Sequence, residues 1–262
     1  MTAAWAVWKA LGDGDYVPAN HGDAPPEVVG RDVVIVDFSY RRAIMEQMHA
    51  EAKSLLVLDH HKSAQADLEG LPFAVFDMQR SGAGMAWDWF HPGQARPALV
   101  DLVEDGDLWR HALHGTKEFQ LRLEMEPMDI SNWDRIAEMS NQKLEVFISE
   151  GAVLKRAFDG EVALLLADRY VVTLAGESGL AVNATSRYSS ELGHHLAALS
   201  DSFGMVWRQL DGKLKISLRS SGAYDVALLA AKFGGGGHRN AASFTLPLNI
   251  ESYALVAGKP LR

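Results

Sequence analysis

The chain has 262 residues, of which 48% are hydrophobic, so it is long enough for one large domain or two modest ones with a substantial core. It contains no cysteine, which excludes disulfides, thiolate zinc sites and a cysteine nucleophile, and which fits a reducing cytoplasm. The formal charge of −9 argues against tight, sequence-independent binding of long duplex nucleic acid, because such binding needs many Lys and Arg contacts to phosphate.

The first half of the chain alternates short apolar runs with helical patterns. An Ala-rich pattern with apolar spacing predicts a helix over residues 2–11. All-apolar runs predict buried strands, and the segments between and after them predict helices. The expected strands are 33–36, 55–58 and 73–76, and the expected helices are 41–52 and 81–90. Such alternation is typical of a parallel sheet that is covered on both faces.

The second half of the chain has a different pattern of predicted helices and strands. A charged helical pattern over residues 130–158 predicts the helices that connect two domains. Beyond it the sequence predicts strands and helices of a mixed α+β domain, and Asp211-Gly212 is a strong hairpin signal. The expected strands are 162–166, 170–174, 204–210 and 214–218, and the expected helices are 188–199 and 225–232. The predicted organisation is a parallel-sheet α/β domain over 1–125, a helical connector over 126–158 and a smaller α+β domain over 159–262.

Carboxylates and histidines follow the predicted strands of the first domain. Asp37 and the run Asp59-His60-His61 each come directly after an apolar strand, at the sheet edge where ligands of parallel sheets bind. Asp105-Gly106-Asp107 follows Leu102-Val103 and is interpreted as a third strand end, where residues two apart point the same way. Divalent ions such as Mn²⁺ accept carboxylate and imidazole ligands together. Single Asp residues after apolar runs are more often helix caps or turn residues, which is the structural alternative.

A glycine run near the other end of the chain indicates an anion site. Gly234-Gly235-Gly236-Gly237-His238 exposes backbone N–H groups and adds an imidazole, a combination that suits a phosphate. Upstream, Arg219 ends a predicted strand and can clamp a phosphate with paired donors. The structural alternative is a flexible loop beside a surface arginine.

These motifs together resemble the DHH phosphoesterases, in the subfamily that carries a DHH-associated domain at the carboxyl end. Val36-Asp37-Phe38-Ser39 looks like the second family motif, Asp59-His60-His61 is similar to the name-giving motif, and Val103-Glu104-Asp105 looks like the fourth. Ser217-Leu218-Arg219-Ser220 and residues 234–238 match the substrate-binding motifs of the second domain. The resemblance covers almost the whole chain and implies a DHH domain joined by helices to a DHH-associated domain.

The resemblance also implies roles for single residues. Asp37, His60 and Asp105 correspond to metal ligands, with Asp107 as the reserve for Asp105, and Mn²⁺, or Mg²⁺ or Co²⁺, is the implied cofactor. Asp59 and His61 correspond to supporting catalytic residues beside the metal and the substrate phosphate. The substrate-binding set is Arg219, Gly234, Gly235, Gly236, Gly237 and His238. Family members begin with a strand and a further ligand motif, for which no counterpart precedes the helix over 2–11, so we expect the DHH domain to be incomplete at its amino end.

The sequence leaves more than one function open. Our first expectation is a cytoplasmic, metal-dependent phosphoesterase that hydrolyses short nucleotides or related small phosphoesters in a cleft between its domains. The alternative is a catalytically impaired nucleotide-binding protein, a sensor or sponge, and an exopolyphosphatase or pyrophosphatase is a weaker third reading. Because no leader and no apolar stretch of membrane-spanning length is recognisable, we expect no membrane association. A homodimer is the assembly that base rates favour.

Overall fold

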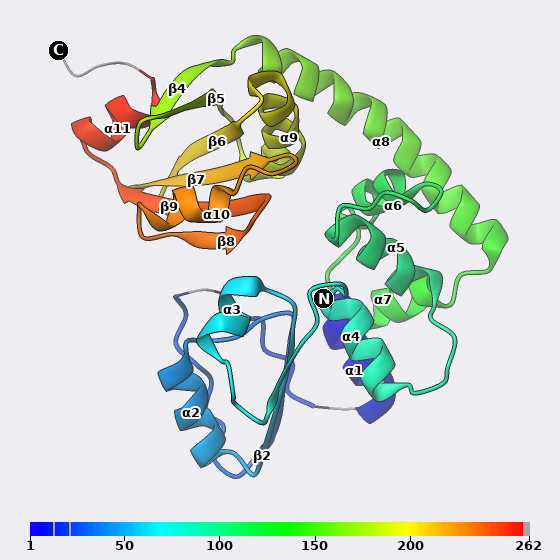
Figure 1. Ribbon diagram of the computed structural model, residues 1–262. Helices are drawn as coiled ribbons and strands as arrows, with labels where there is room; N and C mark the ends of the chain where they lie inside the picture. The colour runs from blue at the N-terminus through cyan, green and yellow to red at the C-terminus, as the bar shows by residue number, and fades with distance from the viewer. Residues whose placement is uncertain (13, 21, 259–262) are drawn as a thin grey trace. The chain divides into compact units, whose positions relative to one another are not determined.

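The computed structural model describes residues 1–12, 14–20 and 22–258 (Figure 1). They form two compact units, divided between Arg156 and Ala157, and each is described by itself. Among the described residues, no helix combines the length and the apolar character that a membrane crossing requires.

A three-stranded parallel sheet organises the first unit. Its strand order is β1-β2-β3, and both pairings are parallel, as the sequence predicts. The strands are β1 (Asp32–Val36), β2 (Ser54–Asp59) and β3 (Ala74–Phe76). The helices of this unit are α1 (Thr2–Leu11), α2 (Arg42–Glu51), α3 (Lys62–Asp67), α4 (Gly82–Phe90), α5 (Ala98–Asp107), α6 (Thr116–Leu123) and α7 (Ile130–Ala137). The predicted helices over 2–11, 41–52 and 81–90 are confirmed as α1, α2 and α4.

Both faces of this sheet are buried. Leu58 of β2 packs into a core formed by α1, α4, α5 and α7, in which the rings of Trp5 and Trp87 stack with centroids 5.5 Å apart. The neighbouring Val57 packs into a second core on the opposite face, together with Met45 of α2. Because successive strand residues point to opposite faces, an all-apolar strand is required where both faces are covered. This explains why the strands carry continuous apolar runs instead of alternation.

The segment around Asp105 is helical, so the prediction of a third strand end there is wrong. α5 starts after Pro97 and buries Leu99, Val100 and Leu102 against the first core. The run Leu102-Val103 therefore belongs to one face of a helix, and its short length could not distinguish a strand from a helix. Because of the helical geometry, the side chains of Asp105 and Asp107 point in different directions.

α8 (Asn141–Ala167) is one continuous helix of 27 residues, so the predicted strand over 162–166 is also wrong. Val162 packs against the second unit's core together with Leu165 and Leu166, which is helical spacing. Leu and Ala favour helices, and the helix continues through Asp159-Gly160, the turn signal that precedes this apolar run. The segment predicted as a separate connector, 126–158, packs on the first unit through Trp133 and Ile136 of α7.

A six-stranded sheet of order β4-β5-β6-β7-β9-β8 organises the second unit. Only β5 and β6 are parallel, and the other neighbours are antiparallel. The strands are β4 (Tyr170–Leu174), β5 (Glu177–Asn183), β6 (Phe203–Leu210), β7 (Lys213–Ser220), β8 (Gly236–His238) and β9 (Ala241–Pro247). The predicted hairpin is confirmed, since Asp211 and Gly212 join β6 to β7 with φ of 52° and 68°, the left-handed pair that a two-residue turn requires.

Helices cover this second sheet on both faces. α9 (Ser189–Ser200) follows the 3₁₀ turn η1 (Ser186–Tyr188), and its Leu192 and Leu196 pack on one face with Val182 and Val206. α10 (Val226–Ala231) and α11 (Ile250–Val256) bury apolar residues on the other face. The predicted helices over 188–199 and 225–232 correspond to α9 and α10. β5, β8 and β9 were not predicted, because Ser and Gly weaken the strand pattern there.

A buried glutamate stabilises the start of α4, and its charge predicts a pH-dependent contribution to folding. Glu104 accepts hydrogen bonds from the Ser81 amide at 2.9 Å and from Arg96 at 2.9 Å. Burial raises the pKa of Glu104, but these donors outweigh burial, so the pKa lies below its ordinary value. A lowered carboxylate pKa stabilises the fold above the ordinary pKa, and this contribution is lost as the pH falls through the folded-state pKa.

We therefore expect Glu104→Gln to lower the free energy of unfolding by about 2 kcal/mol at pH 7, because it removes charge-assisted hydrogen bonds. The difference from wild type should shrink as the pH falls below about 4. Chemical denaturation at both pH values measures it, with Glu46→Gln as the control, since Glu46 makes only an exposed pair with Arg42 and should change stability by less than about 0.5 kcal/mol. Equal, pH-independent effects of the two substitutions would contradict the account.

Candidate functional site

Asp37 ends β1 in a conformation that turns its carboxylate across the sheet edge. Its φ is 58°, in the left-handed region that few residues other than Gly, Asn and Asp adopt. Its amide donates to the carbonyl of Leu58 at 2.9 Å, so the backbone remains tied to β2. The strained φ therefore places a carboxylate beside the end of the neighbouring strand, as is common at functional sites.

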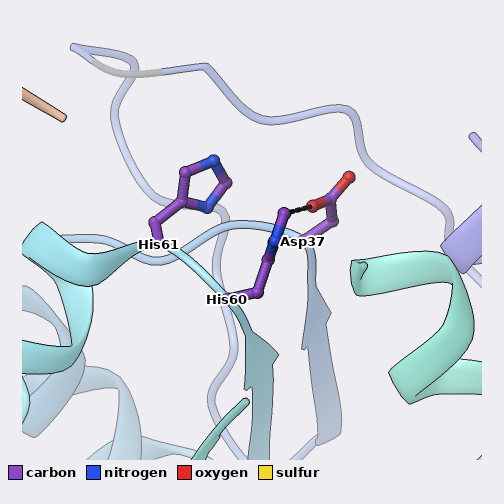
Figure 2. Close-up of side chains that lie close together, drawn as sticks. All are labelled: Asp37, His60 and His61. Atoms are coloured by element: carbon purple, nitrogen blue, oxygen red, sulfur yellow. Dashed lines mark ion pairs between the residues drawn. The ribbon is translucent and has the colours of Figure 1, made fainter. Parts of the chain in front are cut away.

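His60 lies between two carboxylates at this edge. Its Nε2 is 3.2 Å from Oδ1 of Asp37 and 3.4 Å from Oδ2 of Asp107 (Figure 2 shows His60 directed at Asp37). Burial lowers the pKa of His60, but the hydrogen bond to Asp37 and the charge of Asp107 outweigh it and raise the pKa. The pKa of Asp107 is raised by burial and by the like charge of Asp37. Crowded carboxylates of this kind create a negative potential that favours a cation.

Asp59 is completely buried and fixes the histidine pair. Its Oδ1 accepts from the amide of His60 at 2.7 Å and lies 2.6 Å from Nδ1 of His61. The hydrogen bond with Asp59 raises the pKa of His61. Burial raises the pKa of Asp59, but His61 and the amides outweigh it, so that pKa is lowered. Asp59 thus remains ionised and orients the imidazole of His61.

The donors at this edge fit a divalent cation. Asp37, His60 and His61 each offer one ligand atom, and these atoms all lie within 4.8 Å of one another. In addition, Oδ2 of Asp59 is buried with no hydrogen-bond partner among the described residues. A buried ionised oxygen needs a compensating donor or cation. Mixed carboxylate and imidazole ligands suit Mn²⁺ and related ions.

Asp105 and Asp107 occupy different environments, although the sequence could not separate them. Asp105 is buried and accepts from the amides of Ala112 and Leu113 and from the hydroxyl of Thr116. Through these hydrogen bonds Asp105 closes the loop after α5. Asp107 contacts His60 and keeps 42% of its side chain exposed. The geometry therefore favours Asp107 as the third carboxylate at the site.

The candidate anion-binding residues of the second unit lie in one row across its sheet. Arg219 of β7 pairs with Ala241 of β9, and Ala241 pairs with His238 of β8. Residues directly opposite each other point to the same face, so Arg219 and His238 project together, roughly 10 Å apart at the backbone. Burial lowers the pKa of Arg219, and no described carboxylate pairs with it. A half-buried guanidinium without a counter-ion is suited to an anionic ligand.

Two residues of α9 position Arg219. Ser190 accepts a hydrogen bond from Nη2 of Arg219 at 2.9 Å. Gly193 leaves room for the stem of that side chain, since a Cβ at Gly193 would lie 2.6 Å from Cγ of Arg219. Neither residue is recognisable from the sequence, because serine and glycine in a helix carry no signal without the tertiary contact.

Part of the glycine run is required by packing. A Cβ at Gly235 would lie 2.2 Å from the carbonyl oxygen of Ser243, and one at Gly237 would lie 2.5 Å from that of Ala241. Gly234 and Gly237 also have positive φ, at 75° and 145°. A Cβ at Gly236 would meet nothing within 4 Å. Close approach to β9 therefore explains two of the glycines, whereas there is open space where a side chain of Gly236 would lie.

Comparisons with known proteins agree with this division of the chain. Residues 169–256 match the DHHA1 domain. The chain is also similar to the uncharacterized protein R106 of Acanthamoeba polyphaga mimivirus. The two are 28% identical over an alignment of 226 residues, which covers 82% of this chain. The match covers 53% of that protein, so the chain spans about half the length of the curated relative it matches.

Solved structures show the same fold. The pGpG-specific phosphodiesterase PggH from Vibrio cholerae is similar over 97% of this chain and 92% of its own, with a TM-score of 0.50 and 15% identity. RecJ from Thermus thermophilus, solved in complex with Mn²⁺, is similar over 86% of this chain and 43% of its own, with a TM-score of 0.43 and 14% identity. The likeness in fold rests on the first of these two structures.

The chain combines an Asp-His-His motif at the end of a parallel strand with a matched DHHA1 domain. Residues 169–256 thus match the domain that the resemblance to the DHH phosphoesterases predicts, and the overall fold agrees with that resemblance.

Gly82 predicts a test of the first site. A Cβ at Gly82 would lie 2.3 Å from Cβ of Asp37, which is too close to be relieved by a side-chain rotation. We expect Gly82→Ala to displace Asp37 and to weaken Mn²⁺ binding on the order of tenfold, measured by isothermal titration calorimetry. Gly160→Ala is the control, because a Cβ there meets nothing within 4 Å. Unchanged Mn²⁺ affinity in a folded Gly82→Ala protein would show that Asp37 does not bind the metal.

Gly193 predicts a test of the second site. Gly193→Ala should push Arg219 away from Ser190 and weaken binding of inorganic pyrophosphate in EDTA on the order of tenfold, the loss expected for a charge-assisted hydrogen bond. Arg219→Gln should cause a similar loss, and Gly160→Ala should cause none. If Gly193→Ala binds pyrophosphate like wild type, Arg219 does not depend on α9 for its position.

Proposed function

We propose that this protein is a metal-dependent phosphohydrolase that cleaves phosphate esters of short nucleotides or related small phosphoesters. One observation carries the proposal: Nε2 of His60, at the carboxyl edge of a parallel sheet, lies 3.2 Å from a carboxylate oxygen of Asp37 and 3.4 Å from one of Asp107. The DHHA1 match over residues 169–256 and the likeness in fold to a phosphodiesterase support the hydrolase class. Mn²⁺ is the ion that we propose, since the mixed oxygen and nitrogen donors suit it.

In this proposal the first unit holds the cation through Asp37, His60 and Asp107. Asp107 takes the place that the resemblance gave to Asp105, because Asp107 contacts His60 and Asp105 is committed to the loop amides. A bound divalent cation supplies Lewis-acid activation of phosphate-ester hydrolysis at neutral pH. The remaining chemistry belongs to the chain's own side chains.

His61 is the proposed proton donor. Asp59 holds its Nδ1 at 2.6 Å and raises its pKa, so the imidazolium persists to a higher pH. The other nitrogen, Nε2, would then deliver a proton to the leaving oxygen. Asp59 acts through His61 and is a positioning residue.

The second unit supplies recognition of the substrate's anionic group. Arg219 offers paired donors without a competing carboxylate, and His238 lies in the same cross-strand row. The open space beside Gly236 leaves room for that anionic group in this proposal. Fixing one phosphate in this way would hold one end of the substrate.

The test is hydrolysis of a 5′-phosphorylated dinucleotide by the full chain, with and without Mn²⁺. We expect turnover that requires the metal and that falls on the order of 100-fold in His60→Ala and in Asp107→Asn, because each removes a ligand. Asp105→Asn is the matched control and should lower stability while the folded protein keeps its affinity for Mn²⁺.

Two outcomes would contradict the proposal in different ways. Metal-independent turnover, or turnover that survives His60→Ala, would remove the metal site from the reaction. Absence of turnover in folded protein that binds Mn²⁺ and also binds the dinucleotide would favour the non-hydrolytic sensor.

A further inference from the structure

The outward face of β7 carries a stripe of positive charge on an acidic protein. The strand alternates strictly, with Leu214, Ile216 and Leu218 buried in the core. The residues between them point to the opposite face and are Lys213, Lys215, Ser217 and Arg219. Lys213 and Lys215 are exposed, and Ser217 and Arg219 are half-buried. Lys213 and Lys215 therefore continue the line that begins at Arg219, away from the row that contains His238.

The neighbouring strand adds a further cation to this face. Arg208 of β6 pairs directly with Lys215, and Lys215 pairs with Thr245 of β9. Like charges directly opposite each other destabilise a sheet. Neither Arg208 nor Lys215 forms an ion pair with any residue that the structure describes. Repulsion between these two cations destabilises the free protein, and a bound anionic ligand would reduce it.

Small polar residues complete this face. Ser217 pairs with Ser243 of β9, and Ser243 pairs with Gly236 of β8. Ser243 and Thr245 are exposed, and α9 packs on β5, β6 and the Arg219 end of β7. The hydroxyl groups can donate to or accept from sugars and bases between the cationic positions.

We propose that Arg208, Lys213 and Lys215 form a phosphate track that extends the Arg219 clamp and binds the backbone of a single-stranded oligonucleotide of three or more nucleotides. The proposal deepens the proposed function, on which it rests for the role of Arg219. A dinucleotide engages Arg219 alone, whereas each further phosphate reaches the next cation. Affinity should therefore rise with substrate length.

Spacing selects an oligonucleotide over inorganic polyphosphate. Alternate residues on a strand lie about 7 Å apart, so the line from Arg219 to Lys213 spans roughly 20 Å. Successive phosphates in polyphosphate share one oxygen and lie much closer together than the cations do. An extended nucleotide backbone separates its phosphates by a sugar, which matches the spacing of the lysines better and places polar groups beside Ser217 and Ser243.

The test measures binding by fluorescence anisotropy, with the full chain in EDTA and labelled deoxyadenylate strands of two and five nucleotides. Wild type should bind the longer strand more tightly. The double variant Lys213→Gln/Lys215→Gln should lose on the order of tenfold in affinity for the pentanucleotide and little for the dinucleotide. The slope of log affinity against log salt should fall by about 1.4, or about 0.7 for each lost phosphate contact.

The matched control is Lys53→Gln/Lys143→Gln, which removes the same charge from exposed positions of the first unit and should leave the length dependence intact. Equal losses for both strands in the Lys213/Lys215 variant, or wild-type binding that does not increase with length, would overturn the track. Stronger competition by inorganic polyphosphate than by the pentanucleotide would overturn the choice of ligand. Because EDTA removes turnover from the assay, a failure here is distinguishable from a failure of the proposed hydrolysis.

Discussion

The structure of the first unit depends on a concentration of negative charge around one imidazole. Asp37 and Asp107 approach His60 from different elements, and Asp59 lies buried directly before it. Without a cation, a protonated His60 is the group that offsets the repulsion between these carboxylates, and the pKa of His60 is raised accordingly. A divalent ion balances this negative charge more completely, because it can bind both carboxylates and the imidazole directly.

The surrounding strands and helices hold those carboxylates in place. Parallel pairing of β1 with β2 brings Asp37 and His60 to one edge. Gly82 at the start of α4 permits the close approach of Asp37, and Glu104 fixes that helix start through Ser81. α4 and α5 then pack in one core, so the end of α5 delivers Asp107 to His60. Rigid neighbours of this kind are what a preorganised ligand set requires.

The sequence predicted the elements whose signals are local. All-apolar runs gave the three parallel strands, and the Asp211-Gly212 pair gave the hairpin. It failed for the segments around Leu102 and Leu164, because short apolar runs suit a strand and a buried helix equally well. The sequence also could not decide between Asp105 and Asp107 as the ligand. Only the tertiary contacts show that Asp105 binds loop amides and that Asp107 contacts His60. Ser190 and Gly193 were missed for the same reason.

The measurement that tests the account most directly is anomalous diffraction from crystals of the full chain grown with Mn²⁺. The account predicts an anomalous peak within bonding distance of a carboxylate oxygen of Asp37, a carboxylate oxygen of Asp107 and the Nε2 of His60, with Asp105 still bound to the amides of Ala112 and Leu113. A peak coordinated by Asp105 instead of Asp107 would contradict the ligand assignment. Absence of any peak at this edge, in crystals saturated with Mn²⁺, would contradict the metal site itself.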